Sequence, residues 1–169
     1  TGKVGVCFAT SGPGVTNLVT GLADATADSI PVVAITGQVP EHLVGTDGFQ
    51  EIDVLGLSLA VTKHAFQVTD VKDLEATLHK AFAIAANGRP GAVLVDIPKN
   101  VQIADVVSKE LPIDTSFALP RVEDDALSAA RELLKAAKKP ILYVGGGVSL
   151  GDAVSEFRKF AQTTQMPCV

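Results

Sequence analysis

The sequence has little cysteine, no apolar run of membrane-spanning length and no excess of positive charge. Its two cysteines, Cys7 and Cys168, lie in apolar stretches, which argues against a disulfide framework or a structural zinc site and favours a reducing compartment. No apolar run reaches the ~18–20 residues of a membrane helix, so no membrane partner is expected. With a net charge of −5, the chain lacks the clustered Lys and Arg of a broad nucleic-acid surface, and no nucleic-acid partner is expected either.

The chain does contain enough apolar sequence to build a core. Of its 169 residues, 47% are hydrophobic and 20% charged, which excludes disorder. The 15 glycines and 9 prolines follow no short period, which excludes collagen and low complexity. The chain begins at Thr1 without a methionine or a targeting pattern, and it stops in an apolar stretch at 166–169 where a strand is starting. We therefore expect a piece of a longer protein.

Apolar runs alternate with segments of helical periodicity through the first hundred residues. Strands are predicted at 4–9, 30–36, 65–68 and 92–97. Helices are predicted at 15–27, 52–61 and 71–86, with Asp70 as the N-cap of the last, and 39–50 is expected to be a loop. This alternation predicts right-handed crossovers and a mostly parallel sheet flanked by helices, which is an α/β fold.

A second α/β unit is predicted after a stretch of little periodicity that ends at Pro120. Its expected elements are a helix at 123–137, a strand at 140–144, a glycine turn at 145–147 and a helix at 152–164. We therefore divide the chain into a first domain at 1–112, a linker at 113–120 and the beginning of a second domain at 121–169.

Small residues fill the loop at 10–17, directly after the first predicted strand. They let a ligand approach the backbone, and the following helix offers unpaired N–H groups. The spacing is neither that of a Walker loop nor that of a dinucleotide fingerprint. A tight strand-to-helix turn explains the same residues, so both interpretations stay open.

A second candidate, at 45–51, places Phe49 and Gln50 in a loop where a core needs neither. The ring offers an apolar wall and the amide a donor or acceptor for a ligand. The alternative is a helix-capping segment, with Asp47 as the cap and Gln50 and Glu51 in the first turn.

Two cations, Arg89 and Lys99, flank the predicted strand at 92–97 and are candidates for binding an anion, although solvated surface charge explains them equally well. The glycine turn at 145–147 follows a strand, where open α/β sheets bind ligands.

No nucleophile elbow, Cys/His pair or metal-ligand spacing is present, and no metal ligand is predicted. The chemistry therefore belongs to a cofactor or to residues outside this chain.

Five motifs occur in the order 10–17, 28–38, 45–51, 88–91 and 96–99. Together they resemble the catalytic large subunits of the acetolactate synthase (acetohydroxyacid synthase) family, thiamine-diphosphate enzymes, with the bacterial form most similar. The resemblance implies a three-domain subunit, of which this chain holds the later part of the pyrimidine-binding domain and the start of the middle domain. It also implies condensation of two pyruvates, or of pyruvate with 2-ketobutyrate, with release of CO2 in branched-chain amino-acid biosynthesis.

The resemblance also implies roles for single residues around thiamine diphosphate. Pro13 and Asn17 match positions near the aminopyrimidine ring. Gln50 matches a glutamine that lines the cofactor and substrate pocket, and Phe49 matches the aromatic beside it. Lys99 matches a lysine in the substrate channel.

A structural FAD is implied as well. Arg89 matches an arginine that contacts it, and Gly145, Gly146 and Gly147 match a middle-domain turn against it. Pro40 matches a site tied to herbicide binding at the channel mouth. The family's activating glutamate and its Gly-Asp-Gly diphosphate and Mg²⁺ motif are not in this sequence, so the Mg²⁺ ligands lie outside it and the chain alone is expected to be inactive.

The expected assembly is a cytoplasmic homodimer or homotetramer, with a small regulatory subunit as a further partner. Rival enzymes are glyoxylate carboligase, a keto-acid decarboxylase or oxidase, and an FAD-free catabolic acetolactate synthase. A free-standing α/β binding module without enzymatic activity is the alternative from a different class.

Overall fold

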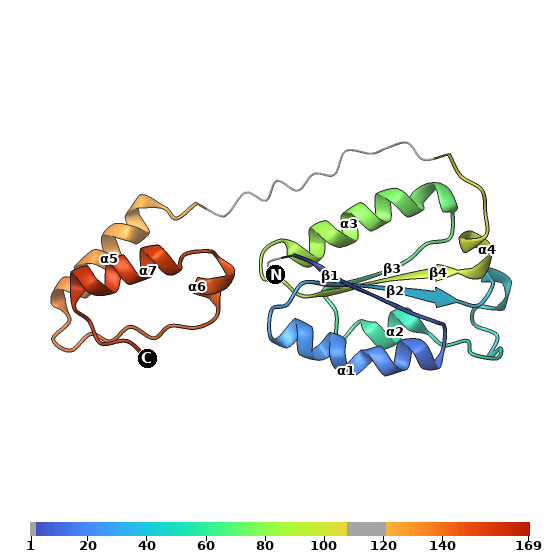
Figure 1. Ribbon diagram of the computed structural model, residues 1–169, viewed down its shortest axis with the longest axis horizontal. Helices are drawn as coiled ribbons and strands as arrows, with labels where there is room; N and C mark the ends of the chain where they lie inside the picture. The colour runs from blue at the N-terminus through green and yellow to red at the C-terminus, as the bar shows by residue number, and fades with distance from the viewer. Residues whose placement is uncertain (1–2, 108–120) are drawn as a thin grey trace. The chain divides into compact units, whose positions relative to one another are not determined.

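A computed structural model describes residues 3–107 and 121–169 (Figure 1). The chain divides into two compact units, one in each described range. The predicted linker at 113–120 lies outside the described residues, as does the end of the first domain at 112.

The first unit is built on a four-stranded parallel sheet in the order β1-β2-β4-β3. Its strands are β1 (Gly5–Ala9), β2 (Val32–Gln38), β3 (His64–Gln67) and β4 (Ala92–Pro98). The central strand β4 is buried along its whole length, as its unbroken apolar run predicts. The predicted α/β fold with a parallel sheet is therefore confirmed.

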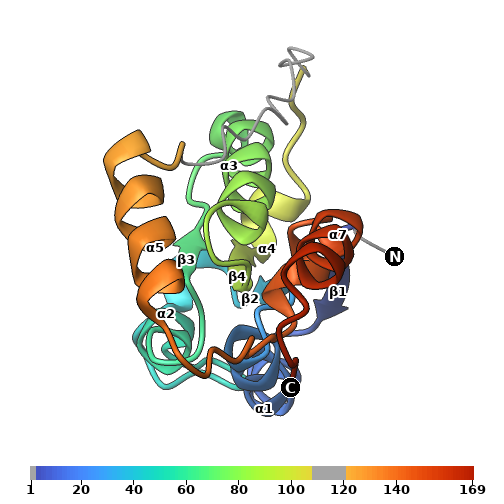
Figure 2. The same ribbon diagram turned by 90° about the vertical axis from the view of Figure 1, so that its left-hand side faces the viewer.

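Helices cover both faces of this sheet (Figures 1 and 2). They are α1 (Pro13–Ala27), α2 (Val54–Ser58), α3 (Leu74–Ala86) and the short α4 (Lys99–Gln102), with 3-10 turns η1 (Glu41–Leu43) and η2 (Val71–Asp73). Helix α3 packs on the face that carries Val93 and Val95. Helices α1 and α2 pack on the other face, around Leu94. Alternate β4 side chains thus supply two separate cores.

Several helix boundaries differ from the prediction, and one short helix was not predicted. Helix α2 starts at Val54 and not at 52 because Asp53 caps it, accepting from the Gly56 N–H at 2.9 Å, and it ends at Ser58 before the predicted 61. Asp70 caps the 3-10 turn η2 rather than an α-helix, so α3 starts at Leu74. Pro98 is the last residue of β4, and the chain turns directly into α4, which periodicity did not predict.

The second unit contains α5 (Asp124–Ala136), α6 (Gly147–Leu150) and α7 (Val154–Thr164). The strand predicted at 140–144 is reduced to a parallel bridge between Leu142 and Cys168. Leu142 N–H donates to the Pro167 carbonyl at 2.8 Å, and Val169 N–H donates to the Leu142 carbonyl at 2.9 Å. The apolar stretch at 166–169 therefore pairs with this segment. In neither described range does a helix have the length and apolar character needed to cross a membrane.

Candidate functional site

The strands of the first unit are parallel, so their carboxyl ends meet at one edge of the sheet. Pro13 begins α1 just after β1, and Asn17 lies one turn further along the same helix face; both are exposed. Lys99 follows β4 directly, and the loop that carries Phe49 and Gln50 follows β2. The five residues assigned to thiamine diphosphate and substrate thus all follow strand ends at this edge.

A contact between Gly12 and Gln50 joins two of these loops. Gly12 has φ +58°, and a Cβ there would lie 2.8 Å from the carbonyl oxygen of Gln50 and 2.9 Å from its Cα. Only glycine permits this backbone-to-backbone approach. The loop after β1 and the loop after β2 therefore form one continuous wall at the edge.

The 45–51 loop is closed on itself. Gly45 N–H donates to Oε1 of Glu51 at 3.1 Å, and Glu51 N–H donates to the Gly48 carbonyl at 2.9 Å. Asp47 and Gln50 adopt left-handed backbone conformations, with φ of 55° and 59°. Such conformations cost about 1–3 kcal/mol each and occur mainly where the surroundings enforce them, often at functional sites.

The helix-capping interpretation of this loop is wrong. Residues 47–51 lie outside any helix, and the cap of α2 is Asp53. Phe49 is 91% exposed, which also excludes a core role for its ring. The loop therefore presents a large apolar ring beside the half-buried Gln50.

A buried carboxyl group that the sequence analysis did not identify lies in β4, two residues before the carboxyl end of that strand. Asp96 is fully buried in β4, between Thr36 of β2 and Gln67 of β3 in register. Thr36 Oγ1 donates to Oδ1 at 2.8 Å, whereas Gln67 Nε2 and Gln38 Nε2 donate to Oδ2 at 3.1 and 3.3 Å. Burial raises the pKa of Asp96 above its usual value, although the three hydrogen bonds oppose this shift. Its signal in the sequence is a lone carboxylate within an apolar strand.

Arg89 lies at the opposite, amino edge of the sheet, so β4 separates it from Lys99. Its Nε donates to Ser29 Oγ at 2.8 Å, and its Nη2 donates to the Ala27 carbonyl at 2.6 Å. Ala27 is the last residue of α1, where a cation also interacts favourably with the helix dipole. Arg89 is therefore no freely solvated charge, and its contact with FAD stays a prediction.

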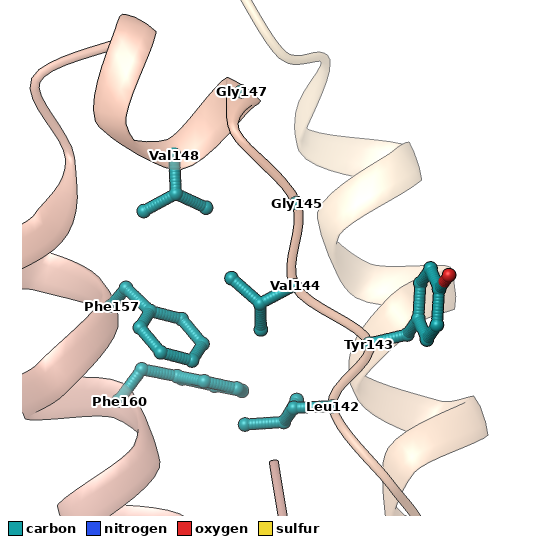
Figure 3. Close-up of a pocket in the computed structure, with 8 residues that line it drawn as sticks. All are labelled: Leu142, Tyr143, Val144, Gly145, Gly147, Val148, Phe157 and Phe160. Carbon is teal, nitrogen blue, oxygen red and sulfur yellow. The ribbon is translucent and has the colours of Figure 1, made fainter. Parts of the chain in front are cut away.

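Glycines of the predicted FAD turn line a cavity of about 440 Å³ in the second unit (Figure 3). Side chains of Leu142, Val144, Val148, Phe157 and Phe160 point into it, whereas Tyr143 points away. A Cβ at Gly145, Gly146 or Gly147 would meet nothing within 4 Å, so packing inside this unit does not require glycine there. The lining is mostly apolar and carries no charged side chain, so the cavity offers a phosphate no charged partner. Elsewhere in the described ranges, no group of three His, Cys, Asp or Glu residues is placed to hold a metal ion.

Comparison with known proteins identifies the class. Residues 1–57 match the family model of the thiamine pyrophosphate enzyme N-terminal TPP binding domain, and residues 127–169 match that of the thiamine pyrophosphate enzyme central domain. The chain belongs to the thiamine pyrophosphate (thiamine diphosphate) enzyme family.

Within this family, the chain is similar over essentially its whole length to acetolactate synthase large subunits. It is 54% identical, over 99% of its length, to the acetolactate synthase isozyme 2 large subunit of Escherichia coli (strain K12). The identity is 52% over 100% of the chain for the acetolactate synthase large subunit of Corynebacterium glutamicum, and 44% over 98% for the probable large subunit of Methanocaldococcus jannaschii. The resemblance inferred from the five motifs is thereby confirmed. The chain spans only 30%, 28% and 29% of the lengths of these relatives.

Proposed function

We propose that the polypeptide carrying this chain is an acetolactate synthase catalytic subunit. It would condense two pyruvates, or pyruvate and 2-ketobutyrate, with release of CO2, in branched-chain amino-acid biosynthesis. The observation that carries this proposal is about 50% identity to acetolactate synthase large subunits along the full chain. The wall formed by Gly12 and Gln50 supports it, because it gives the motif residues a common edge.

Thiamine diphosphate fits this edge on two counts. Pro13 and Asn17 are exposed at the start of α1, and the exposed Phe49 ring offers an apolar surface. We assign Pro13 and Asn17 to the aminopyrimidine ring and Gln50 to the junction of cofactor and substrate. When bound, thiamine diphosphate supplies the nucleophilic carbon that the side chains of this chain lack.

The residues of this chain would bind and shield the substrate. The Lys99 ammonium is exposed and makes no hydrogen bond or ion pair to any residue that the structure describes, so it is available to attract a keto-acid carboxylate. Phe49 would exclude water from the reacting carbon, and Gln50 would orient a polar group without adding charge.

FAD and Mg²⁺ are further proposals. The apolar cavity beside Gly145, Gly146 and Gly147 would hold the flavin ring. Arg89 would reach a phosphate with the N–H donors that α1 does not use. Ligands for Mg²⁺ would come from outside this chain.

The assembly is proposed from the names of the relatives. Several are called large subunits, which fits a small regulatory subunit as a partner. We further propose a homodimer or homotetramer in the cytoplasm, which the two free cysteines, Cys7 and Cys168, suit.

The experiment is a product assay on the full-length polypeptide. With thiamine diphosphate and Mg²⁺, pyruvate should yield acetolactate and CO2, and the purified protein should be yellow with FAD. The 169-residue chain alone serves as the control and should be inactive. Acetaldehyde, a glyoxylate-derived product or no turnover would overturn the proposal in favour of another thiamine-diphosphate enzyme or a binding module.

A further inference from the structure

The side-chain amide of Gln38, at the carboxyl end of β2, is held in one orientation. Val39 N–H donates to its Oε1 at 2.8 Å, so this atom must be the amide oxygen. Nε2 therefore faces the other way, where it donates to the Ile52 carbonyl at 3.1 Å and to Oδ2 of Asp96 at 3.3 Å. A flipped amide would leave all three contacts unsatisfied.

Ile52 is the residue through which this amide reaches the 45–51 loop. Within the described ranges, every hydrogen bond of residues 45–51 has its partner among residues 43–51. These bonds therefore close the loop but do not attach it to the sheet. The bond from Gln38 to the Ile52 carbonyl attaches the chain to β2 directly after the loop ends, and the Ile52 side chain packs there against the core around Leu94.

The other support of the loop is Gly12, on which the Gln50 backbone rests. Gln50 is thus located from two sides, by the Gly12 contact and by the Gln38–Ile52 hydrogen bond. Its left-handed conformation, with φ 59°, persists only if the surroundings enforce it. Losing the hydrogen bond from Gln38 should therefore loosen it.

We propose that Gln38 is a positioning residue: its amide, oriented by Val39 and Asp96, fixes the Ile52 carbonyl and so holds Gln50 at the strand-end edge. That the ligand at this edge is thiamine diphosphate rests on the proposed function. The hydrogen bond joins two residues of this chain, so loop mobility tests the inference separately.

The test compares Gln38→Met with Gln67→Met in the full-length polypeptide. Both side chains donate to the same oxygen of Asp96, at 3.3 and 3.1 Å, so each variant removes one of its donors. Only Gln38 also reaches Ile52. Any effect confined to Gln38→Met therefore does not come from Asp96, and exchange at 45–53 reports on the loop and not on the Val39 N–H, which also loses its acceptor.

The readouts are backbone hydrogen exchange of residues 45–53, the Kd for thiamine diphosphate and the melting temperature. Both variants should melt at a lower temperature, but only Gln38→Met should speed exchange at 45–53 and raise the Kd, each by about tenfold. Unchanged exchange in Gln38→Met, or equal acceleration in both variants, overturns the inference. Faster exchange confined to Gln38→Met in a protein that binds no thiamine diphosphate would support the positioning role and overturn the proposed function instead.

Discussion

Replacing Asp96 with Asn should stabilise the first unit at neutral pH. Asn can keep all three hydrogen bonds: its oxygen accepts from Gln38 and Gln67, while its N–H₂ donates to Thr36, whose hydroxyl can turn and accept. The substitution therefore removes the buried charge and keeps an acceptor for both glutamine amides, while the hydroxyl hydrogen of Thr36 loses its acceptor. Asp96→Ala, in contrast, leaves two amide donors and a hydroxyl without their acceptor.

The magnitudes separate the two variants clearly. Each unit by which the pKa of a group is raised destabilises its ionised form by about 1.4 kcal/mol. Burial raises the pKa of Asp96, and Asn avoids the resulting penalty because it is never ionised. We therefore expect Asp96→Asn to be more stable than the wild type at neutral pH. Asp96→Ala should lose about 3 kcal/mol or more, since a buried donor without an acceptor costs about 1–3 kcal/mol.

The pH dependence has a defined sign. Because the pKa of Asp96 is raised by burial, the folded state binds more protons than the unfolded state between the usual value of 3.8 and the native pKa. The stability of the wild type therefore falls as pH rises through this window, and the penalty is complete above it. The advantage of Asp96→Asn should grow over the same window and then stay constant.

Native-state hydrogen exchange of the β4 amides in the full-length polypeptide measures this, because the slowest amides report opening of the sheet. The exchange free energies of the wild type and Asp96→Asn are compared at a series of pH values. An Asn variant that is less stable than the wild type at pH 7, or a difference that does not vary with pH, would refute the reasoning.

Further substitutions test the site and its supports. Gly12→Ala should raise the Kd for thiamine diphosphate more than tenfold, because its Cβ would lie 2.8 Å from the Gln50 carbonyl oxygen; Gly21→Ala, whose Cβ meets nothing within 4 Å, should leave the Kd unchanged in the same titration. Gln50→Gly should relieve a strained φ of 59° and keep or raise the melting temperature while lowering kcat for pyruvate; an unchanged kcat would remove Gln50 from the site. Arg89→Ala should destabilise the first unit by about 1–3 kcal/mol in denaturant titrations, since it loses two hydrogen bonds to residues 27 and 29. Full flavin occupancy in that variant would make the role of Arg89 structural alone.

The sequence was sufficient to predict the layers of the first unit. Unbroken apolar runs such as 92–97 require burial on both faces, and the alternating helices then require a parallel sheet. Boundaries were less accurate where local capping competes with periodicity. Asp53 shortens α2, and Asp70 starts a 3-10 turn before α3, because a side chain that caps the backbone fixes a helix end whatever the apolar pattern suggests.

The arrangement of the site was only partly predictable. Motif order placed Pro13, Gln50 and Lys99 after strands, and strand direction then places them at one edge. The approach of Gly12 to Gln50 joins loops that are distant in sequence, so no local pattern encodes it. The same holds for the hydrogen bond between Gln38 and Ile52, which depends on the register of folded strands.

The measurement that tests the central claim most directly is a thiamine diphosphate titration of the full-length polypeptide, with Mg²⁺ present, followed by backbone hydrogen exchange. If the edge after β1 and β2 binds the cofactor, residues 10–17 and 45–53 gain protection together, with one common Kd. Binding that leaves both segments unprotected would contradict the placement of the site, and the absence of binding would contradict the function itself.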